Sequence, residues 1–538
     1  MSATPASRAI LTPRRLLVPL ILAFLVLAGS AMQYTSTTFD EPVFSAVGAR
    51  GLRTGDFGLV KDHPRLPQYL YGIPLYLAGV NYPPEEVARA AGLPHYQYAR
   101  ALFWESGNDP QRLALLARVV GLAFGVATVL ATFLLGRRHL GEGAALFAAA
   151  LVAFLPDMLG HSGVAYSDVP LAFGLLVGVY ALDAAVRRPT RARVALAALA
   201  FALTASVKYS GLVLGPILVT LLALEAASGR RRDPAWRRAI LVAAPLFVGV
   251  VYATLVAVYL GDWRLGEFMG GLSRGAGGAG GRDAFLLGEH YAGGRWYFFP
   301  VAIALKTPVA LHVLALLAAL GAWIAARHGR AREWLAQGAR APAVGAAFFF
   351  AVLLFAPLNI GSRHALPLLP LLCILVAQGV APFWRAGPTA VRAALAVVFA
   401  GFVLSSLRPY PYFLSYLGEY ASGRATYETL VDSSTDWGQG LIGLRDFMRE
   451  RGIDAVALGY WGSALPESYG IRYAPLPSYF PLREQPALPA EPRYIVVSAT
   501  LLAGFVQSDP YAALRKARPA AVVGGSLYVF DREALGRR

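Results

Sequence analysis

Long runs of apolar side chains recur along this chain, and they constrain its fold more than any other feature. Runs long enough, or nearly long enough, to cross a bilayer lie at about 16–33, 113–135, 143–158, 169–186, 192–207, 211–226, 239–260, 297–326, 342–358, 364–383 and 393–407. Of the 538 residues, 56% are hydrophobic and only 15% are charged, which is more apolar surface than one soluble core can bury. We therefore predict an α-helical polytopic membrane protein with about eleven transmembrane helices.

Arginine residues gather in alternate loops between the apolar runs. These loops contain Arg137 and Arg138; Arg187, Arg188, Arg191 and Arg193; Arg230, Arg231, Arg232, Arg237 and Arg238; Arg327, Arg330 and Arg332; and Arg385 with Arg392. Because cytoplasmic loops are enriched in Lys and Arg, all five fit one topology with the N-terminus in the cytoplasm. The same rule accounts for the net charge of +17, and no basic domain interleaved with aromatic residues indicates nucleic acid as a partner. Membrane lipids are the expected surroundings.

Three regions are expected outside the cytoplasm: a first loop at about 34–112, a Gly-rich loop at about 261–296 and the tail after about 408. The first loop contains stretches typical of interfacial helices. The tail contains the runs AVALGYW, YIVVSA and AVVGGSLYVF, which predict a small mixed α/β domain. We therefore place a transmembrane domain over 1–407 and an extracytoplasmic domain over 408–538. The first apolar run is taken as an uncleaved anchor, with a cleaved signal peptide as the alternative.

Acidic residues stand at the predicted outer ends of two crossings. Asp40 and Glu41 follow the first crossing in TTFDEP, where a carboxylate can take a proton from an attacking hydroxyl. Asp168 begins the fourth crossing in YSDVP. For Asp40, and for Ser167 or Asp168, capping of the following helix is the alternative interpretation.

Cationic residues gather on the same side of the predicted bundle. They are Lys208, Lys306, Arg363, His364 and Arg118. A charge inside an apolar segment is costly unless it snorkels to the interface or binds an anion, and snorkelling is the alternative for Lys306 and Arg118. If these groups converge, they form a site for a phosphate at membrane depth. His63 in KDHPRL is a candidate ligand for a metal or a phosphate, or else a solvated loop histidine.

At these residues the chain resembles the polyprenyl-phosphate-dependent glycosyltransferases of the protein O-mannosyltransferase type, family 39, with bacterial relatives such as the lipid A aminoarabinose transferase. The Asp-Glu pair at 40–41 is the most specific sign. Further similar stretches are HPRLPQ near 63–68, YSDVPLAF near 166–173, VKYSGL, GGRWYFFPVAIALKTP, NIGSRHALP and DSSTDWGQGL near 432–441. The resemblance covers most of the chain.

The resemblance implies the membrane glycosyltransferase fold called GT-C, a polyprenyl-phosphate sugar as donor, and an active site that faces the periplasm or exterior from a bacterial inner membrane. It implies Asp40 as the catalytic base, Glu41 as its neighbour and Asp168 as a second acid in the pocket. Relatives often read His-Pro-Pro-Leu or Glu-Pro-Pro-Leu at 63–66. His63 in place of a glutamate leaves a divalent metal ion open, and Arg65 adds a candidate phosphate contact.

The expected activity is transfer of a hexosyl or pentosyl group to an acceptor hydroxyl, where the acceptor is a protein, a lipid or a glycan. A second function class is a flippase or transporter of lipid-linked sugars, because many crossings with buried charges also suit a substrate pathway. The asymmetric outer regions and the lack of visible inverted repeats argue against it. A third class is a membrane-anchored scaffold whose outer domain binds a partner.

Overall fold

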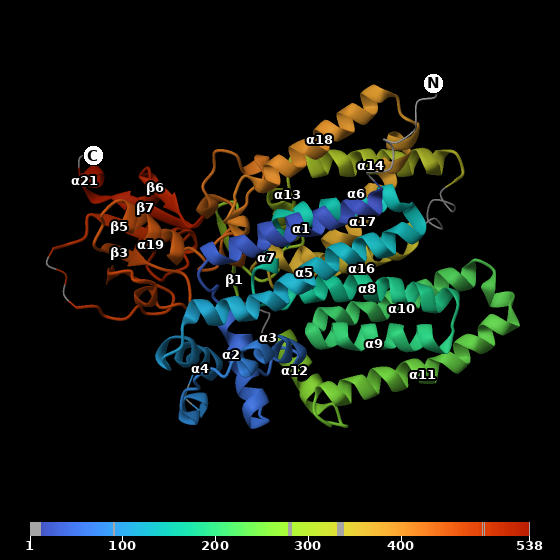
Figure 1. Ribbon diagram of the computed structural model, residues 1–538, viewed down its shortest axis with the longest axis horizontal. Coiled ribbons are helices and arrows are strands. Elements are labelled where there is room, and N and C mark those ends of the chain that lie inside the picture. The colour runs from blue at the N-terminus through green and yellow to red at the C-terminus, as the bar shows by residue number, and fades with distance from the viewer. Residues whose placement is uncertain are drawn as a thin grey trace, which may run out of the picture.

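A bundle of long helices makes up one end of the molecule, and a small β-sheet domain makes up the other (Figure 1). The computed structural model describes residues 12–89, 92–277, 282–330, 338–486, 488 and 490–536. The largest buried apolar cluster lies inside the bundle, where the side chains of Leu175, Val179, Leu214 and Leu371 pack together.

Eight helices in the described ranges are long and apolar enough to cross a membrane. They are α1 (Pro13–Ala31), α5 (Pro110–Leu140), α8 (Asp168–Arg187), α10 (Leu214–Ala227) with the preceding turn η4 (Tyr209–Val213), α11 (Pro234–Val258), α14 (Val309–Arg327), α17 (Leu369–Ala386) with the preceding turn η7 (Ser362–Leu368), and α18 (Thr389–Leu407). Helices of this length and composition bury their apolar surface in lipid. The protein is an integral membrane protein, as predicted.

The remaining predicted crossings are also helical, but they do not bring the count to eleven. Helices α6 (Glu142–Phe154) and α7 (Pro156–Ser162) meet at an angle of 63° and give a ninth span only if they are counted as one. Leu155 between them is extended, because a residue before proline disfavours the helical region. Helices α9 (Arg191–Val207) and α16 (Arg340–Leu354) have only 17 and 15 residues.

The predicted segment at 297–326 is two helices. Helix α13 (Phe298–Lys306) ends at Thr307, and α14 begins after Pro308. Both Thr307 and Pro308 are extended, since proline cannot donate to a continuing helix and constrains the residue before it. This break places the end of α13 inside the protein instead of in lipid.

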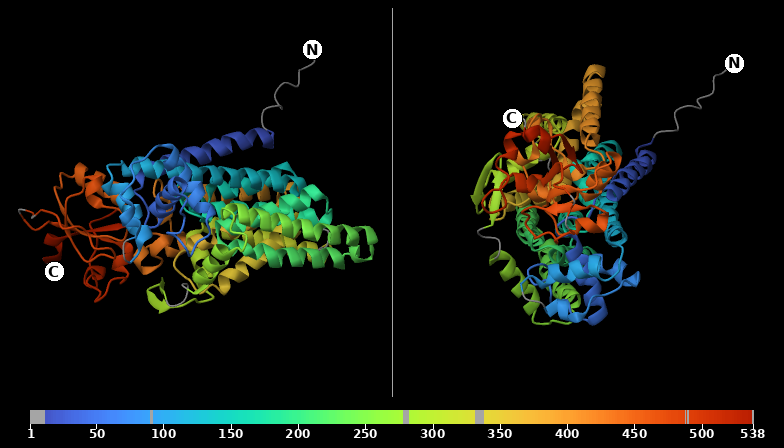
Figure 2. Two further views of the ribbon diagram at one scale, coloured as in Figure 1. Left: turned by 90° about the horizontal axis from the view of Figure 1, so that it is seen from below. Right: turned by 90° about the vertical axis from the view of Figure 1, so that its left-hand side faces the viewer.

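Short helices of the first loop lie between the bundle and the sheet domain (Figure 2). They are α2 (Glu41–Thr54), α3 (Leu66–Leu77) and α4 (Pro94–Arg100). Helices α2 and α3 touch through their backbones, because a Cβ on Gly72 would lie 2.3 Å from the carbonyl carbon of Gly48. This close crossing fixes the start of α2, where Asp40 and Glu41 stand. The Gly-rich region adds α12 (Gly266–Gly277) and the hairpin β1 (Asp283–Leu286) and β2 (Glu289–Ala292).

The tail folds into a mixed five-stranded sheet with the order β4-β3-β5-β7-β6. Its strands are β3 (Val456–Gly459), β4 (Tyr473–Pro475), β5 (Tyr494–Ser498), β6 (Ala521–Val523) and β7 (Leu527–Asp531), with the helices α19 (Leu441–Glu450), α20 (Ala499–Leu502) and α21 (Arg532–Gly536). Strand β3 is parallel to β4 and β5, whereas β7 is antiparallel to β5 and β6. The predicted α/β character of the tail is confirmed. The domain boundary at 407/408 stays a prediction, although α18 ends at Leu407.

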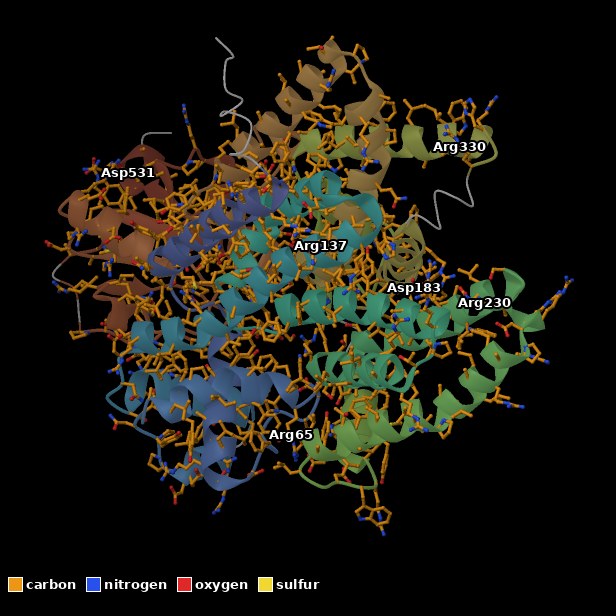
Figure 3. All side chains as sticks on the ribbon, turned by 45° about the vertical axis from the view of Figure 1, so that its right-hand side comes forward. Arg65, Arg137, Asp183, Arg230, Arg330 and Asp531 are labelled. Atoms are coloured by element: carbon orange, nitrogen blue, oxygen red, sulfur yellow. The ribbon has the colours of Figure 1, made fainter. Side chains whose placement is uncertain are left out.

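Figure 3 shows where charged residues lie along the bundle. Arg230 and Arg330 lie toward the end of the bundle that is remote from the sheet domain, and the sheet domain carries Asp531. Asp183 lies at that remote end as well and binds Arg340 and Arg187 at 2.5 and 2.8 Å. The arginine-rich loops and the sheet domain therefore stand at opposite ends of the membrane helices.

Candidate active site

Four charged side chains from distant parts of the chain meet at the end of the bundle that faces the sheet domain. Arg363 Nη1 lies 3.2 Å from Asp168 Oδ2, and Arg363 Nη2 lies 3.6 Å from Asp40 Oδ2. Lys208 Nζ donates to Asp168 Oδ1 at 2.6 Å. We call Asp40, Asp168, Lys208 and Arg363 the charged cluster. The structure thus brings together four residues that the sequence singled out separately.

Each member of the charged cluster stands at a helix end. Asp40 precedes α2, Asp168 begins α8, Lys208 follows α9, and Arg363 lies in η7 before α17. Helix capping was the alternative for the acids, yet neither Asp40 nor Ser167 makes a side-chain capping hydrogen bond. The two carboxylates are directed at cations, while the helix N-termini behind them still favour their negative charge.

Exposure divides the charged cluster into two pairs. The side chains of Asp168 and Arg363 are only 2% and 4% exposed, and they bind each other. Those of Asp40 and Lys208 are 20% and 18% exposed. Asp40 and Lys208 are therefore the members that a bound molecule can reach directly, and the buried pair holds them in place.

Glu41 turns away from the charged cluster into the protein. Arg118 binds both of its carboxylate oxygens, with Nε and Nη2 at 2.8 and 2.9 Å, and gives its remaining N–H groups to oxygens of the α1–α2 connection. The backbone N–H groups of Thr38 and Ala165 also donate to Glu41, each at 3.0 Å. Neither Glu41 nor Arg118 is exposed at all. Arg118 is thus not free to snorkel, and its hydrogen bonds are satisfied inside the protein.

Lys306 is likewise engaged within the protein. Its Nζ lies 3.0 Å from Asp157 Oδ1 and donates to the carbonyl oxygens of Leu414 and Ser434 at 2.8 and 2.7 Å. A lysine has three N–H groups, and these contacts use all of them. The structure does not bring Lys306 into the charged cluster, and it leaves no donor for a phosphate there.

A pocket of about 330 Å³ opens beside the charged cluster, between the first loop and α12. Lys61, His63, Arg65 and Arg274 line it together with Glu267, which binds Arg65. His63 Nε2 lies 3.4 Å from the hydroxyl of Tyr166, so His63 stands between the pocket and the cluster. The pocket carries more positive than negative groups, which favours an anion.

His364 follows Arg363 in η7 and is half-buried. Its ring stacks on Phe299 of α13, with the ring centroids 6.3 Å apart. This contact positions the His364 ring beside α13, next to Arg363 of the charged cluster.

His63 Nδ1 lies 3.1 Å from Asp62 Oδ1. Among the residues that the structure describes, no group of three or more His, Cys, Asp or Glu side chains is arranged to hold a metal ion. A role of His63 as a metal ligand stays a prediction.

The segment 432–439 contains most of the residues that contact the site but were not predicted as site residues from the sequence. The guanidinium of Arg363 lies 4.3 Å from the ring centre of Trp437 and 4.5 Å from that of Tyr166. Aromatic faces attract a guanidinium electrostatically.

Tyr96 of α4 donates a short hydrogen bond to Asp40 Oδ1, and burial raises the Tyr96 pKa, so this hydroxyl stays protonated.

The same segment is hydrogen-bonded to the residues just before Asp40. The N–H of Phe39 donates to the carbonyl of Trp437 at 2.8 Å, and the N–H of Ser36 donates to the carbonyl of Gln439 at 3.1 Å. On its other side, Ser434 Oγ accepts from the N–H of Ser362 at 3.0 Å. Residues 432–439 therefore connect the two segments that carry Asp40 and Arg363. The motif DSSTDWGQGL was noticed in the sequence, but nothing in its composition indicated this contact.

Two acids of this segment are held in apolar surroundings. Burial raises the pKa of Asp432 to about 7, although Arg363 opposes the rise. Burial also raises the pKa of Asp436 to about 6, while the N–H of Thr500 donates to its carboxylate at 2.8 Å. Asp432 stands near Asp40 and Arg363, and it therefore adds a carboxyl group to the wall of the site. This carboxyl group gains or loses its proton near neutral pH.

Known proteins resemble this chain in sequence and in fold. Residues 18–228 match the family model described as dolichyl-phosphate-mannose-protein mannosyltransferase. No match was found among curated protein sequences. The crystal structure of ArnT from Cupriavidus metallidurans bound to undecaprenyl phosphate aligns with a TM-score of 0.51 and 14% identity over 96% of this chain and 98% of that chain.

The structure of the same ArnT in the apo state aligns with a TM-score of 0.51 and 13% identity over 96% of this chain and 97% of that chain. Likeness at this level of identity shows the fold alone. The chain therefore has the GT-C fold that the sequence resemblance predicted, shared with ArnT over nearly its whole length, and over residues 18–228 it matches the dolichyl-phosphate-mannose-protein mannosyltransferase family.

Proposed function

We propose that this protein is a membrane glycosyltransferase that moves a sugar from a polyprenyl-phosphate donor to an acceptor hydroxyl. The acceptor oxygen attacks the anomeric carbon, and the bond from that carbon to the phosphate oxygen breaks with both electrons staying on the phosphate. The proton of the acceptor hydroxyl goes to Asp40. The lipid phosphate leaves as a monoester.

The convergence of Asp40 and Lys208, the two accessible members of the charged cluster, carries this proposal. Asp40 supplies a base, and Lys208 supplies a cation for the charge that grows on the leaving phosphate. Arg363 lies 3.6 Å from Asp40, which is loose for an ion pair, so a phosphate can compete for its guanidinium. Asp168 orients both Lys208 and Arg363.

The remaining candidates take supporting roles in this proposal. His364 adds a group beside the phosphate, and Arg65 and His63 line the adjacent cationic pocket that accepts the donor head group. Glu41 is a positioning residue, because Arg118 and two backbone N–H groups occupy its oxygens. Lys306 positions the segments that contain Leu414 and Ser434.

The donor class rests on likeness and on chemistry together. ArnT, whose fold this chain shares, was solved with undecaprenyl phosphate bound. The cationic pocket and the charged cluster lie at the end of a membrane bundle, which suits a phosphate carried on a lipid. We propose that this end faces the periplasm or exterior of a bacterial inner membrane, because the arginine-rich loops lie at the opposite end.

The test is transfer of a labelled sugar from polyprenyl-phosphate donors by the purified protein. We expect Asp40→Asn to lower kcat by about a hundredfold or more, in the range for removal of a general base. Glu86→Gln, which neutralises an exposed carboxylate elsewhere in the first loop, is the matched control and should retain full activity. Full transfer by Asp40→Asn would reject the proposed base.

The same assay separates the enzyme from a flippase. An enzyme releases the labelled sugar to an acceptor or to water, whereas a flippase leaves the bond between sugar and phosphate intact. The match to a mannosyltransferase family over residues 18–228 favours the enzyme.

A further inference from the structure

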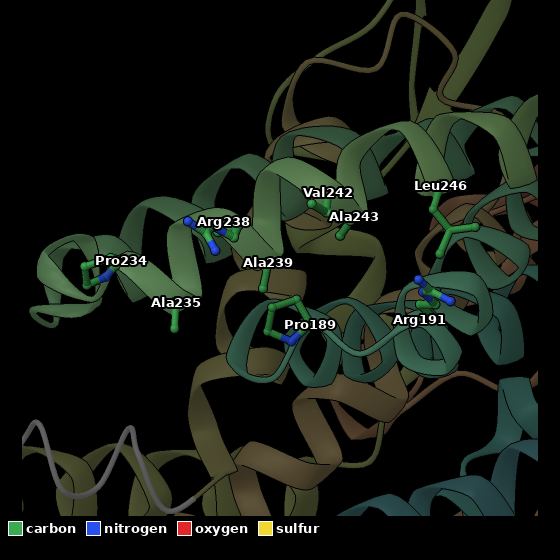
Figure 4. A pocket seen from close by; sticks show the side chains of 9 residues that line it. All are labelled: Pro189, Arg191, Pro234, Ala235, Arg238, Ala239, Val242, Ala243 and Leu246. Carbon is green, nitrogen blue, oxygen red and sulfur yellow. The ribbon is translucent and has the colours of Figure 1, made fainter.

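A second cationic site lies at the other end of the bundle. A groove of about 850 Å³ separates the first half of α11 from the turn between α8 and α9. Figure 4 shows Arg238 on α11 and Arg191 at the start of α9 on two sides of this groove. None of its lining residues takes part in the charged cluster or the adjacent pocket.

The groove has one polar and one apolar part. Arg238 stands in the first turns of α11, and Val242, Ala243 and Leu246 follow it along the same wall. At a rise of about 1.5 Å per residue, Leu246 lies roughly 12 Å deeper along the helix than Arg238. Arg238 thus stands near the start of this wall, and Figure 4 shows Arg191 across the groove beside Leu246.

Among the described residues, neither arginine of the groove has an acidic partner, in contrast to three other arginines of this end of the bundle. Arg187 binds Asp183, Arg230 binds Glu225, and Arg340 binds both acids, at 2.5 to 3.5 Å. Within the part of the chain that the structure describes, no carboxylate forms an ion pair with Arg191 or Arg238. Two guanidinium groups beside a groove therefore retain their capacity to bind an anion.

Helix α11 is anchored beside the groove by its first turn and packs farther along against α9, where Phe247 contacts Phe201. The carboxylate of Asp233 caps the helix by accepting from the N–H groups of Ala235 and Trp236. The indole of Trp236 is buried and donates to the carbonyl of Val186 at 3.0 Å. Beyond this anchor α11 is mostly exposed to lipid, so the groove is open to the bilayer from the side.

We propose that this groove binds one anionic phospholipid from the leaflet on the side of the arginine-rich loops. The phosphate lies between Arg191 and Arg238, and an acyl chain lies along Val242 and Leu246. Basic pockets between membrane helices on the cytoplasmic side are suited to such head groups. The bound lipid fills the space between α11 and α9 and stabilises the position of α11.

The test is native mass spectrometry of the delipidated whole protein titrated with phosphatidylglycerol or phosphatidylcholine. We expect phosphatidylglycerol to bind at one site, and Arg191→Gln/Arg238→Gln to weaken its binding by about thirtyfold, since each of the two surface cations contributes on the order of 1 kcal/mol. The control Arg231→Gln/Arg232→Gln removes two exposed charges from the same region outside the groove and should change binding less than about twofold.

Equal weakening in both double variants would show general charge attraction and would overturn the site, as would equal binding of phosphatidylcholine. A second variant, Ala239→Trp, fills the groove without removing charge and should also abolish the bound lipid. Inorganic phosphate alone should leave the thermal midpoint unchanged, because the apolar wall contributes to binding. If inorganic phosphate shifted the thermal midpoint as much as phosphatidylglycerol does, the ligand of the groove would be a simple anion and not a lipid.

Discussion

Charged residues in and around the charged cluster are of two kinds. Glu41, Arg118 and Lys306 have their donors and acceptors used inside the protein, and they have almost no exposure. Asp40 and Lys208 keep an accessible surface. A charge that is fully paired in the interior holds elements together, and an accessible charge is free to meet a substrate.

The first prediction concerns the buried pair. Arg118→Met should lower the free energy of unfolding by about 3–5 kcal/mol, because it leaves the Glu41 carboxylate buried without a counter-charge. Chemical unfolding of the protein in detergent measures this. The exposed Arg112→Met on the first turn of α5 is the control. Unchanged stability with lost transfer would instead assign Arg118 and Glu41 to the reaction itself.

The second prediction concerns pH. The ordinary pKa of Asp432 is 3.8, and burial raises it to about 7 in the folded protein. Between these values the folded protein holds a proton that the unfolded chain has lost, so stability falls as pH rises from about 4 to 7 and levels off above. Asp432→Asn should remove this contribution in thermal unfolding from pH 5 to 8, while Asp436, with its raised pKa, and His95, with its lowered pKa, keep theirs.

Asparagine tolerates the left-handed backbone of Asp432, whose φ is 53°, so the substitution tests the charge and not the turn. Asp446→Asn on the surface of α19 is the control and should keep the full slope. An unchanged slope in Asp432→Asn would mean that another group binds the proton.

At the residue scale, the sequence indicated which side chains matter better than it indicated their partners. Asp40 and Asp168 were predicted as acids at the ends of crossings, and Lys208 and Arg363 as cations on the same side of the bundle, and the four meet. Lys306 and Arg118 were grouped with these cations but face Asp157 and Glu41 instead. A charge within an apolar run shows that a partner is needed, and only tertiary packing determines which one.

At the scale of elements, the segment 432–439 is the part of the chain after α18 that contacts the charged cluster. The guanidinium of Arg363 lies over the ring of Trp437. The backbone of the segment forms hydrogen bonds with the residues before Asp40. The sequence predicted helices and strands from their periodicity, but this segment has neither, so periodicity gave no information about it. The same limit applies to the prolines that divide two predicted crossings.

The third prediction follows from this support. Trp437→Leu should lower kcat by about 3- to 30-fold with a smaller change in KM for the donor, since a cation–π contact contributes roughly 0.5–2 kcal/mol. Trp437→Phe retains an aromatic face and should recover most of the loss. Trp263→Leu, an exposed tryptophan beyond α11, is the control. A Trp437→Phe enzyme as slow as Trp437→Leu would show that the ring volume, and not its face, is required.

At the scale of the whole molecule, chemical labelling tests the orientation of the protein in the membrane. The fourth prediction uses a Cys373→Ser background, because Cys373 is the single cysteine and is buried. An impermeant maleimide should label Gln507→Cys in the sheet domain of intact cells, but should label Arg231→Cys only after permeabilisation. The reverse pattern would place the charged cluster in the cytoplasm.

The hydrogen bonds between Ser36 or Phe39 and residues 437–439 join positions about four hundred apart in the chain. A ribosome adds roughly 5–20 residues per second, so Asp40 precedes these partners by on the order of 20–80 s. During that interval the first membrane helices are made while residues 437–439 do not yet exist. The site that holds Asp40 is therefore complete only when the last quarter of the chain has been synthesised.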